Sequence, residues 1–256
     1  MTGWQDHANR VEYSIFLFGK PVGFNLALEK ESSMSSTVSP SIYPIDDFKS
    51  GESWRLFKIM GEFVEAIDTL HAVGPAISIF GSARTAPDHP DYKKARDLAA
   101  LFARSGYAVI TGGGPGIMSA ANEGASSENA TSVGLIVNLP FEEKSNPHLT
   151  CQVAFDYFFV RKVMFIKYAQ ACIIMPGGLG TLDELFEALT LVQTQRIRKM
   201  PVVMVGTAFW GGLVNWIRER LCQDGLISSK DMDLFQVVDE PEQALKIVQN
   251  FYAESD

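Results

Sequence analysis

The 256-residue chain has few of the residues that build metal and disulfide sites. Its three cysteines, Cys151, Cys172 and Cys222, are scattered, and no CxxC pair occurs, so no disulfide framework is indicated. None of the four histidines is paired with a cysteine at ligand spacing, and we therefore predict no metal site. This cysteine usage is typical of a reducing compartment, which predicts a cytoplasmic location.

Basic clusters and long apolar runs are also missing. The chain carries 22 Lys and Arg against 30 Asp and Glu, a net charge of −8, and no Lys/Arg-rich block. This balance argues against a nucleic-acid or anionic-membrane partner. No apolar run reaches the ~18 residues that a membrane span requires. With 46% hydrophobic residues, the chain can nevertheless bury a full core.

The first 45 residues differ in character from the rest. Residues 14–28 have no clean hydrophobic period, and residues 32–41, SSMSSTVSPS, are a polar linker signal. We interpret residues 1–45 as a mobile N-terminal tail, with Met34 as a hypothetical alternative translation start. Residues 46–256 are predicted to form a single domain.

The remaining sequence alternates between strand and helix patterns. A helix is predicted over residues 53–70, where apolar residues recur at spacings of three and four. From Ala76 onward, apolar runs alternate with amphipathic segments, which is typical of a parallel sheet covered on both faces. We predict an α/β, Rossmann-like, doubly wound sheet with an added N-terminal helix. Strands are expected at residues 76–80, 107–111, 133–137, 153–158, 172–175, 202–205 and 235–238. Helices are expected at residues 90–104, 160–170, 209–221 and 242–252, and two more are expected to begin after the glycine turn at 112–116 and at residue 181.

The stretch at residues 172–191, CIIMPGGLGTLDELFEALTL, combines a buried strand, a glycine turn and a helix start. Thr181 is the expected helix N-cap, with Glu184 as its capping-box partner. Glycines let backbone amides approach an anion, and the first helical amides are unpaired, so this turn suits a phosphate. It has neither the Walker lysine nor the GxGxxG spacing. The alternative is an ordinary tight turn with a capping box.

Two further glycine turns are expected at the same sheet edge, Gly81-Ser82 and residues 112–116. Each alone can be a tight turn, but together the three favour a nucleotide groove beyond the carboxyl ends of the strands. Arg161 and Lys162 begin a predicted helix, where cations oppose the helix dipole and need an anionic partner. That partner is a ligand phosphate or Glu184, which lies one strand–helix unit further on; the alternative is a surface ion pair.

These residues resemble a known family. PGGLGTLDE matches PGGxGTxxE, the signature of the LOG-type (LONELY GUY) phosphoribohydrolases, long described as lysine decarboxylases. GGGPGIM, Arg161-Lys162 and the serine after the first strand are also similar, and the resemblance covers residues 76–252. The long segment before Ala76 is similar to the larger bacterial subtype of this family.

The resemblance implies hydrolysis of the N-glycosidic bond of a nucleoside 5′-monophosphate, either AMP or a cytokinin riboside monophosphate, as in cytokinin biosynthesis. It implies no cofactor and a homo-oligomer, at least a dimer. Arg161 and Glu184 match the family's catalytic pair. We assign substrate binding to the phosphate loop and to residues of the other turns: Ser82, Gly113, Gly114, Gly116, Met118, Glu123, Lys162, Gly177, Gly178, Gly180 and Thr181.

The chemistry of these residues suits that reaction. A carboxylate beside the anomeric carbon stabilises the oxocarbenium-like state and activates water, and an arginine can donate hydrogen bonds to the departing base. Lysine decarboxylation needs pyridoxal phosphate on a lysine, and no lysine lies inside a glycine turn, so we reject this activity. Lys162 is the one conceivable candidate for such a lysine. The alternative function is a non-catalytic nucleotide-binding or cofactor-carrier protein on the same fold.

Three side chains keep two interpretations each. Glu123 lines the ribose site or occupies a solvated helix position, and Met118 touches the base or packs in the core. Glu187, three residues after Glu184, tunes that carboxylate or pairs with Arg196 or Arg198, and we favour the second role. Asp183 is expected to point away from the cleft.

Overall fold

The computed structural model describes residues 14–17, 20–23, 52–137 and 145–253. The chain divides into two units, Met1–Ser41 and Ile42–Asp256. In the first unit, strands β1 (Ser14–Leu17) and β2 (Lys20–Gly23) form an antiparallel hairpin that the sequence analysis did not predict. Met34 and most of the predicted tail lie outside the described residues. The prediction of a single domain over residues 46–256 concerns the second unit.

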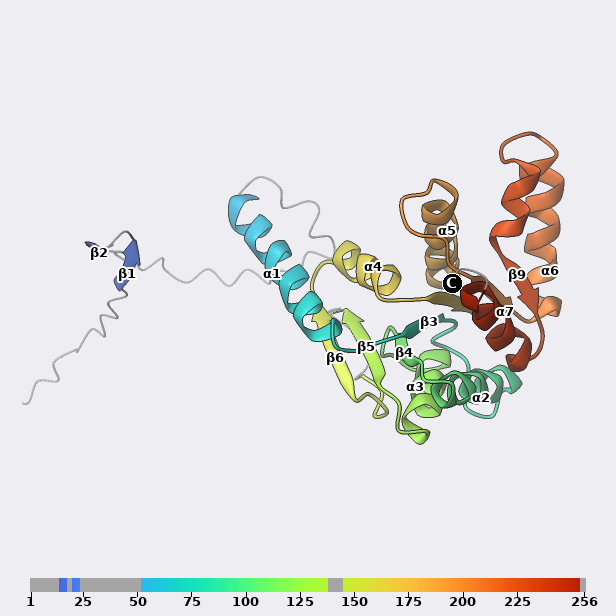
Figure 1. Ribbon diagram of the computed structural model, residues 1–256, viewed down its shortest axis with the longest axis horizontal. Coiled ribbons are helices and arrows are strands. Elements are labelled where there is room, and N and C mark those ends of the chain that lie inside the picture. Colours follow the sequence, from blue (N-terminus) through green and yellow to red (C-terminus); the bar gives the residue numbers. More distant parts are fainter. Residues whose placement is uncertain (1–13, 18–19, 24–51, 138–144, 254–256) are drawn as a thin grey trace, which may run out of the picture. The chain divides into compact units, whose positions relative to one another are not determined.

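The second unit is built on a seven-stranded parallel sheet with the order β6-β5-β4-β3-β7-β8-β9. This arrangement confirms the predicted Rossmann-like α/β fold (Figure 1). Its strands are β3 (Ala76–Phe80), β4 (Ala108–Thr111), β5 (Ser132–Val137), β6 (Cys151–Phe155), β7 (Ala171–Ile174), β8 (Val202–Val205) and β9 (Gln236–Val238).

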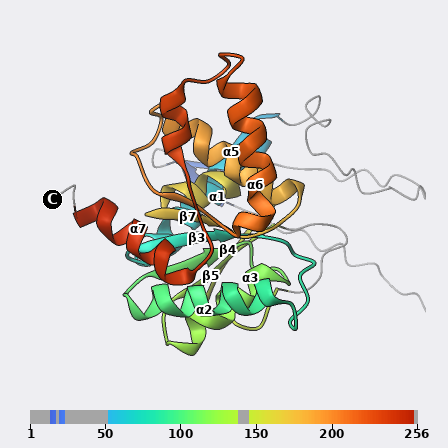
Figure 2. The same cartoon turned by 90° about the vertical axis from the view of Figure 1, so that its right-hand side faces the viewer.

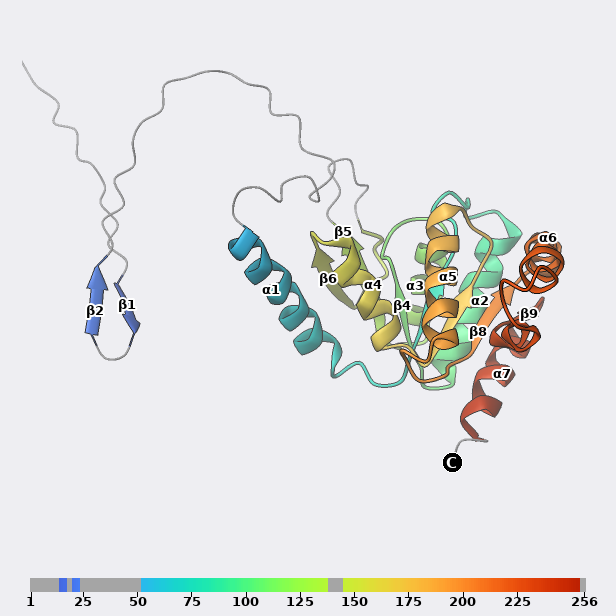
Figure 3. The ribbon, with the colours of Figure 1, turned by 90° about the horizontal axis from the view of Figure 1, so that it is seen from above.

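Helices cover both faces of the sheet. One layer consists of α2, α3 and α7, and the opposite layer contains α1, α4, α5 and α6 (Figures 2 and 3). Their bounds are α1 (Glu52–Leu70), α2 (Pro90–Arg104), α3 (Ile117–Ser127), α4 (Phe158–Lys167), α5 (Leu179–Gln193), α6 (Thr207–Trp216) and α7 (Pro241–Ala253). No described helix has the length and apolar content to cross a membrane.

The central strands are almost entirely apolar because both of their faces are covered, Ser78 of β3 and Thr111 of β4 being buried polar exceptions. Every residue of β3 is buried, and its side chains alternate between two cores. Ala76 and Phe80 belong to the core under α4 and α5, whereas Ile77 and Ile79 belong to the core under α2 and α3. The hydrophobic run therefore stabilises both layers.

The junction between β6 and α4 differs from the prediction. Residues 153–158 were expected as a strand, but β6 ends at Phe155 and α4 begins at Phe158. Glu62 of α1 accepts hydrogen bonds from the backbone amides of Asp156 at 2.8 Å and Tyr157 at 3.3 Å. These bonds satisfy amides at the helix start, where no side chain of Tyr157 forms a cap. A contact from a distant helix thus fixes this boundary.

The C-terminal third also departs from a simple alternation. The single helix expected over residues 209–221 is α6 followed by a π-helical segment, Ile217–Cys222. A 3-10 helix, Ser229–Leu234, was not predicted, although Ser228 and Asp231 form a capping box at its start. Both segments lie away from the glycine turns.

Helices α2 and α3 approach each other most closely at Gly124. A Cβ atom added there would lie 3.0 Å from the backbone nitrogen of Ala100 and would overlap the carbonyl oxygen of Arg96. Gly212, in α6, has nothing within 4 Å of the same added atom.

We expect Gly124→Ala to lower the free energy of unfolding by about 1–3 kcal/mol, because the helices must separate to admit the methyl group. The matched variant Gly212→Ala should raise it by about 0.5–1 kcal/mol through helix propensity. Urea unfolding monitored by circular dichroism measures both, and equal effects of the two variants would contradict this description of the interface.

Candidate functional site

The site is positioned by the order of the strands. From β3 the chain proceeds through β4 and β5 to β6 on one side, and then crosses to β7 on the other side of β3. Ligands of open α/β sheets bind at such a reversal, outside the carboxyl ends of the strands. The turns after β3 and β7 flank this point, and the turn after β4 is adjacent.

Hydrogen bonds connect the three turns. The backbone amide of Ser82 donates to the carbonyl oxygen of Pro176 at 3.0 Å, and the amide of Ile117 donates to the carbonyl oxygen of Ser82 at 3.0 Å. Gly116 has a φ of 66° and touches the backbone of Ser82 and Ala83 so closely that a Cβ atom would overlap it. The predicted grouping of the turns at one edge is therefore present.

A buried polar network holds the turn after β4. Asn146 donates from its side chain to the carbonyl oxygen of Gly114 at 3.1 Å and to Asn122 Oδ1 at 3.0 Å. Thr111 Oγ1 donates to the same Asn122 oxygen at 2.6 Å and accepts from the amide of Gly113 at 2.9 Å. Asn146 was missed by the sequence analysis, because nothing local marks a residue that acts across 32 positions.

The start of α5 corrects the capping prediction. The helix begins at Leu179 with Gly178 as N-cap, and no described side chain forms the cap hydrogen bond. Thr181 is therefore inside the first turn, where it is buried against Gly177. A Cβ atom at Gly177 would overlap the Thr181 side chain, whereas atoms added at Gly178 or Gly180 would meet nothing within 4 Å. The glycines leave open space around uncapped helical amides.

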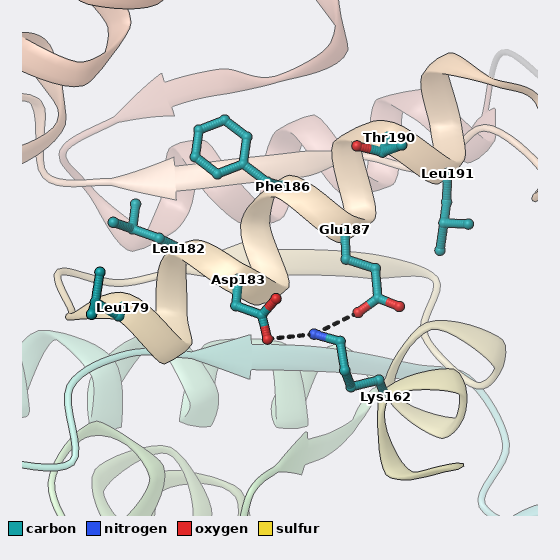
Figure 4. A pocket seen from close by; sticks show the side chains of 8 residues that line it. All are labelled: Lys162, Leu179, Leu182, Asp183, Phe186, Glu187, Thr190 and Leu191. Carbon is teal, nitrogen blue, oxygen red and sulfur yellow. Dashed lines mark hydrogen bonds and ion pairs between the residues drawn. The ribbon is translucent and has the colours of Figure 1, made fainter. Parts of the chain in front are cut away.

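Lys162 of α4 is surrounded by carboxylates of α5. Its Nζ atom lies 2.7 Å from Asp183 Oδ2, 2.7 Å from Glu187 Oε2 and 3.3 Å from Glu184 Oε1. Figure 4 shows the ammonium group between Asp183 and Glu187. Burial alone would lower the pKa of Lys162, but the hydrogen bond to Asp183 and the adjacent carboxylates of Glu187 and Glu184 outweigh it and hold the pKa above its usual value.

Two expectations about α5 are corrected by this cluster. Asp183 was expected to point away from the site, yet its carboxylate accepts a hydrogen bond from Lys162. Glu187 pairs with Lys162, in place of the favoured partners Arg196 or Arg198. The error has one cause, because the sequence does not show which helix packs beside α5.

Glu184 is the buried acid of the site, with a residue exposure of 5%. Oε1 contacts Lys162, whereas Oε2 is buried and has no hydrogen-bond partner in the part of the chain that the structure describes. Burial is the largest influence and raises the pKa of Glu184 from 4.5 to about 7, against the opposing charge of Lys162. Both protonation states are therefore populated near neutral pH.

Arg161 lies on the first turn of α4, beside Lys162. Its guanidinium stands 4.4 Å from the ring centroid of Phe158, and Nη1 is 3.5 Å from the carbonyl oxygen of Leu135 in β5. A Cβ atom added at Gly112 would be 3.9 Å from the same Nη1 atom. Arg161 thus faces the turn after β4, while Lys162 contacts the helix after β7.

Met118 and Glu123, the two predicted site residues of α3, lie in different surroundings. Met118 covers the glycine turn, since Cβ atoms added at Gly112 and Gly114 would each lie 2.8 Å from its side chain. Glu123 instead accepts a hydrogen bond from Tyr92 at 3.2 Å and lies 3.9 Å from Arg96, between α2 and α3. Its observed contacts are therefore helix–helix contacts.

Two hollows adjoin these residues. One, of about 540 Å³, lies on the outer side of α5 and is lined by Lys162, Leu179, Leu182, Asp183, Phe186, Glu187, Thr190 and Leu191 (Figure 4). The other, of about 340 Å³, lies beside the turns after β3 and β4, and Arg84, Gly116, Ser119 and Asn146 are among its lining residues. Within the described ranges, no group of three or more His, Cys, Asp or Glu side chains is arranged to hold a metal ion.

Sequence comparison assigns the family. The profile of a family described as "possible lysine decarboxylase" matches residues 118–248, just over half of the chain. The chain belongs to this lysine decarboxylase-like, or LOG, family. The matched segment contains α4, α5 and the glycine turn between β7 and α5.

Two curated members of the family are cytokinin riboside 5′-monophosphate phosphoribohydrolases. The protein of Mycobacterium tuberculosis is 32% identical over 166 residues, which cover 62% of this chain and 87% of that protein. The protein of Mycobacterium marinum is 30% identical over 164 residues, which cover 63% of this chain and 87% of that protein.

The fold is also found in a protein with a different described role. The molybdenum cofactor carrier protein of Chlamydomonas reinhardtii superposes with a TM-score of 0.54 at 21% identity, covering 70% of this chain and 98% of that one. At this identity the likeness concerns the fold alone.

The raised pKa of Glu184 has a measurable consequence for stability. A carboxyl whose pKa is higher in the folded than in the unfolded state contributes stability below pH 4.5, which is lost as pH rises through about 7. We expect the free energy of unfolding of the wild type, relative to that of Glu184→Gln, to fall by up to about 3 kcal/mol between pH 4.5 and about 7. Urea titrations from pH 4.5 to 8 measure it, and a difference that is constant with pH would contradict the assignment.

Proposed function

We propose that the protein hydrolyses the N-glycosidic bond of a nucleoside 5′-monophosphate, releasing the free base and ribose 5-phosphate. The observation that carries the proposal is Glu184, a buried carboxyl with one unpartnered oxygen in the described structure, beside an uncapped helix start. Unsatisfied buried polar atoms are rare in folded proteins, and perturbed acids cluster at functional sites. The curated relatives support the same reaction class.

The reaction places a specific demand on the charges of the site. Breaking the bond to the base develops positive charge on the ribose, and a nearby carboxylate stabilises that charge and can accept a proton from water. Three carboxylates surround a single ammonium group at Lys162, so the cluster carries an excess of negative charge. An acid that titrates near pH 7 is suited to proton transfer at neutral pH.

The phosphate and the base are assigned to separate turns. The uncapped amides at Gly178, Gly180 and Thr181 would bind the phosphate, because the helix N-terminus carries partial positive charge. Arg161 would donate hydrogen bonds to the base as it leaves with the electron pair of the broken bond, since a guanidinium donates but does not transfer a proton at neutral pH. The proton that Glu184 accepts from water would be returned, directly or through solvent, to the departing base, which restores the carboxylate. Binding at both ends would hold the ribose beside Glu184 and supply orientation. No step of this scheme requires a cofactor.

Lysine decarboxylation, which the family description names, is disfavoured by the state of Lys162. A lysine that forms a Schiff base needs a lowered pKa, so that its amine is neutral. The carboxylates around Lys162 raise its pKa instead. A carrier function on the same fold remains as the competing proposal, and turnover distinguishes the two.

We expect the purified protein to release the free base from at least one of AMP, GMP, CMP, IMP and isopentenyladenosine monophosphate. Glu184→Gln should lower kcat by at least about 100-fold while nucleotide binding changes little, because a proton-transfer group is lost. Chromatography of the products measures turnover, and calorimetry measures binding. The exposed Glu242→Gln on α7 serves as the control for a neutralised surface carboxylate.

Binding of a nucleotide without turnover by the wild type would overturn the hydrolase proposal and support the carrier. Equal turnover by the wild type and Glu184→Gln would remove Glu184 from the mechanism.

A homo-oligomer is the accompanying proposal. Trp54, Phe57, Met60 and Val64 are more than half exposed along one side of α1. Large apolar side chains gathered in this way are typical of an interaction surface. We expect multi-angle light scattering to give a mass of at least twice 28.2 kDa, and a monomer at micromolar concentration would contradict the proposal.

A further inference from the structure

Lys162 was assigned to substrate binding from the sequence, but its contacts indicate another role. All three of its close charged partners are carboxylates of α5, and its side chain is 16% exposed. An ammonium group has three donor hydrogens, and three carboxylate oxygens lie within 3.3 Å of this one. Little donor capacity is left for a ligand phosphate.

The spacing of the carboxylates explains why a cation is needed there. Asp183 and Glu187 are four residues apart and lie on one side of α5, with Glu184 between them. Like charges at this spacing repel one another on a helix. Lys162, reaching across from α4, relieves this repulsion and bridges the two helices.

We infer that Lys162 is a positioning residue: Asp183 and Glu187 fix its ammonium group, which in turn holds Glu184 by Oε1 and leaves Oε2 for the reacting substrate. The inference rests on the proposed function for what Oε2 does. The holding arrangement itself consists of the contacts of Lys162 with the three carboxylates of α5 and can be measured without turnover.

The arrangement also predicts how Glu184 titrates. The charged and titratable groups around it are Lys162 on α4, Asp183 and Glu187 on α5, and Cys172 on β7. Burial raises the pKa of the Cys172 thiol, so that this group stays neutral and does not compete. Lys162 lowers the pKa of Glu184, and Glu187 and Asp183 raise it. Removing the positive charge of Lys162 and removing the negative charge of Glu187 should therefore have opposite effects on the pKa of Glu184.

The first variant is Lys162→Met, which keeps an unbranched side chain and removes the charge. We expect the pKa of Glu184 to rise by about 1 unit or more, because a nearby opposite charge is lost. The second variant is Glu187→Gln, which removes a negative charge close to Glu184 and leaves Lys162 with one fewer carboxylate partner. The pKa of Glu184 should then fall. Lys167→Met, exposed at the last turn of the same helix, is the matched control and should leave it unchanged.

The direct measurement is a carbon-13 NMR titration of glutamate side-chain carboxyls, with the Glu184 signal identified by its absence in Glu184→Gln. Opposite shifts in the two variants are expected, and a structural role alone would not produce them. If Lys162→Met fails to fold, the downward shift in Glu187→Gln remains the test. Unshifted titrations in the folded variants would overturn the inference.

Kinetics on a hydrolysed nucleotide give the second measurement. A positioning role predicts that Lys162→Met lowers kcat by at least about 10-fold with KM nearly unchanged, since the lost interaction acts on the reacting carboxylate. A rise in KM with unchanged kcat would mean that Lys162 binds substrate, and would overturn the inference. If the wild type turns over no nucleotide, the proposed function fails, and the NMR titration alone decides whether Lys162 holds Glu184.

Discussion

Close approach of backbone to backbone at the carboxyl edge of the sheet is the constraint on which the site depends. A Cβ atom at Gly116 would overlap the backbone of the turn after β3, and one at Gly177 would overlap the Thr181 side chain and lie 3.0 Å from the backbone nitrogen of Ser82. Ser82 links these turns by hydrogen bonds to both sides. These contacts bring the ends of β3, β4 and β7 and the starts of α3 and α5 together at one edge of the sheet. Uncapped helical amides at such an edge are suited to an anion.

The charged cluster is built on this frame and depends on helix packing. Helix α4 contributes one cation, and one turn of α5 contributes three carboxylates. Burial of Glu184 is the largest influence and disfavours ionisation of this carboxyl; Lys162 opposes it, and the negative charges of Glu187 and Asp183 add to it. The fold is shared with a cofactor carrier protein, so any distinction between carrying and hydrolysing a ligand lies in such side chains.

The helix that precedes the sheet takes part in the same construction. Glu62 of α1 accepts hydrogen bonds from the backbone amides of Asp156 and Tyr157, which lie five and four residues before Arg161. The start of α4 is therefore fixed from outside the segment that the family profile covers. Helix α1 is in this way connected to the placement of the candidate site.

Periodicity and glycine spacing determined the sheet, the helix layers and the three turns, because these features follow from local patterns of burial and backbone freedom. Strand β3 and helix α2 begin and end where the sequence predicted. Only the tertiary structure decided the partners of Lys162, Glu187 and Glu123, and the role of Asn146, because each depends on which elements pack side by side. The helix start at Gly178 belongs to the same class: Thr181 is a good cap by composition, but its burial against Gly177 places it inside the turn.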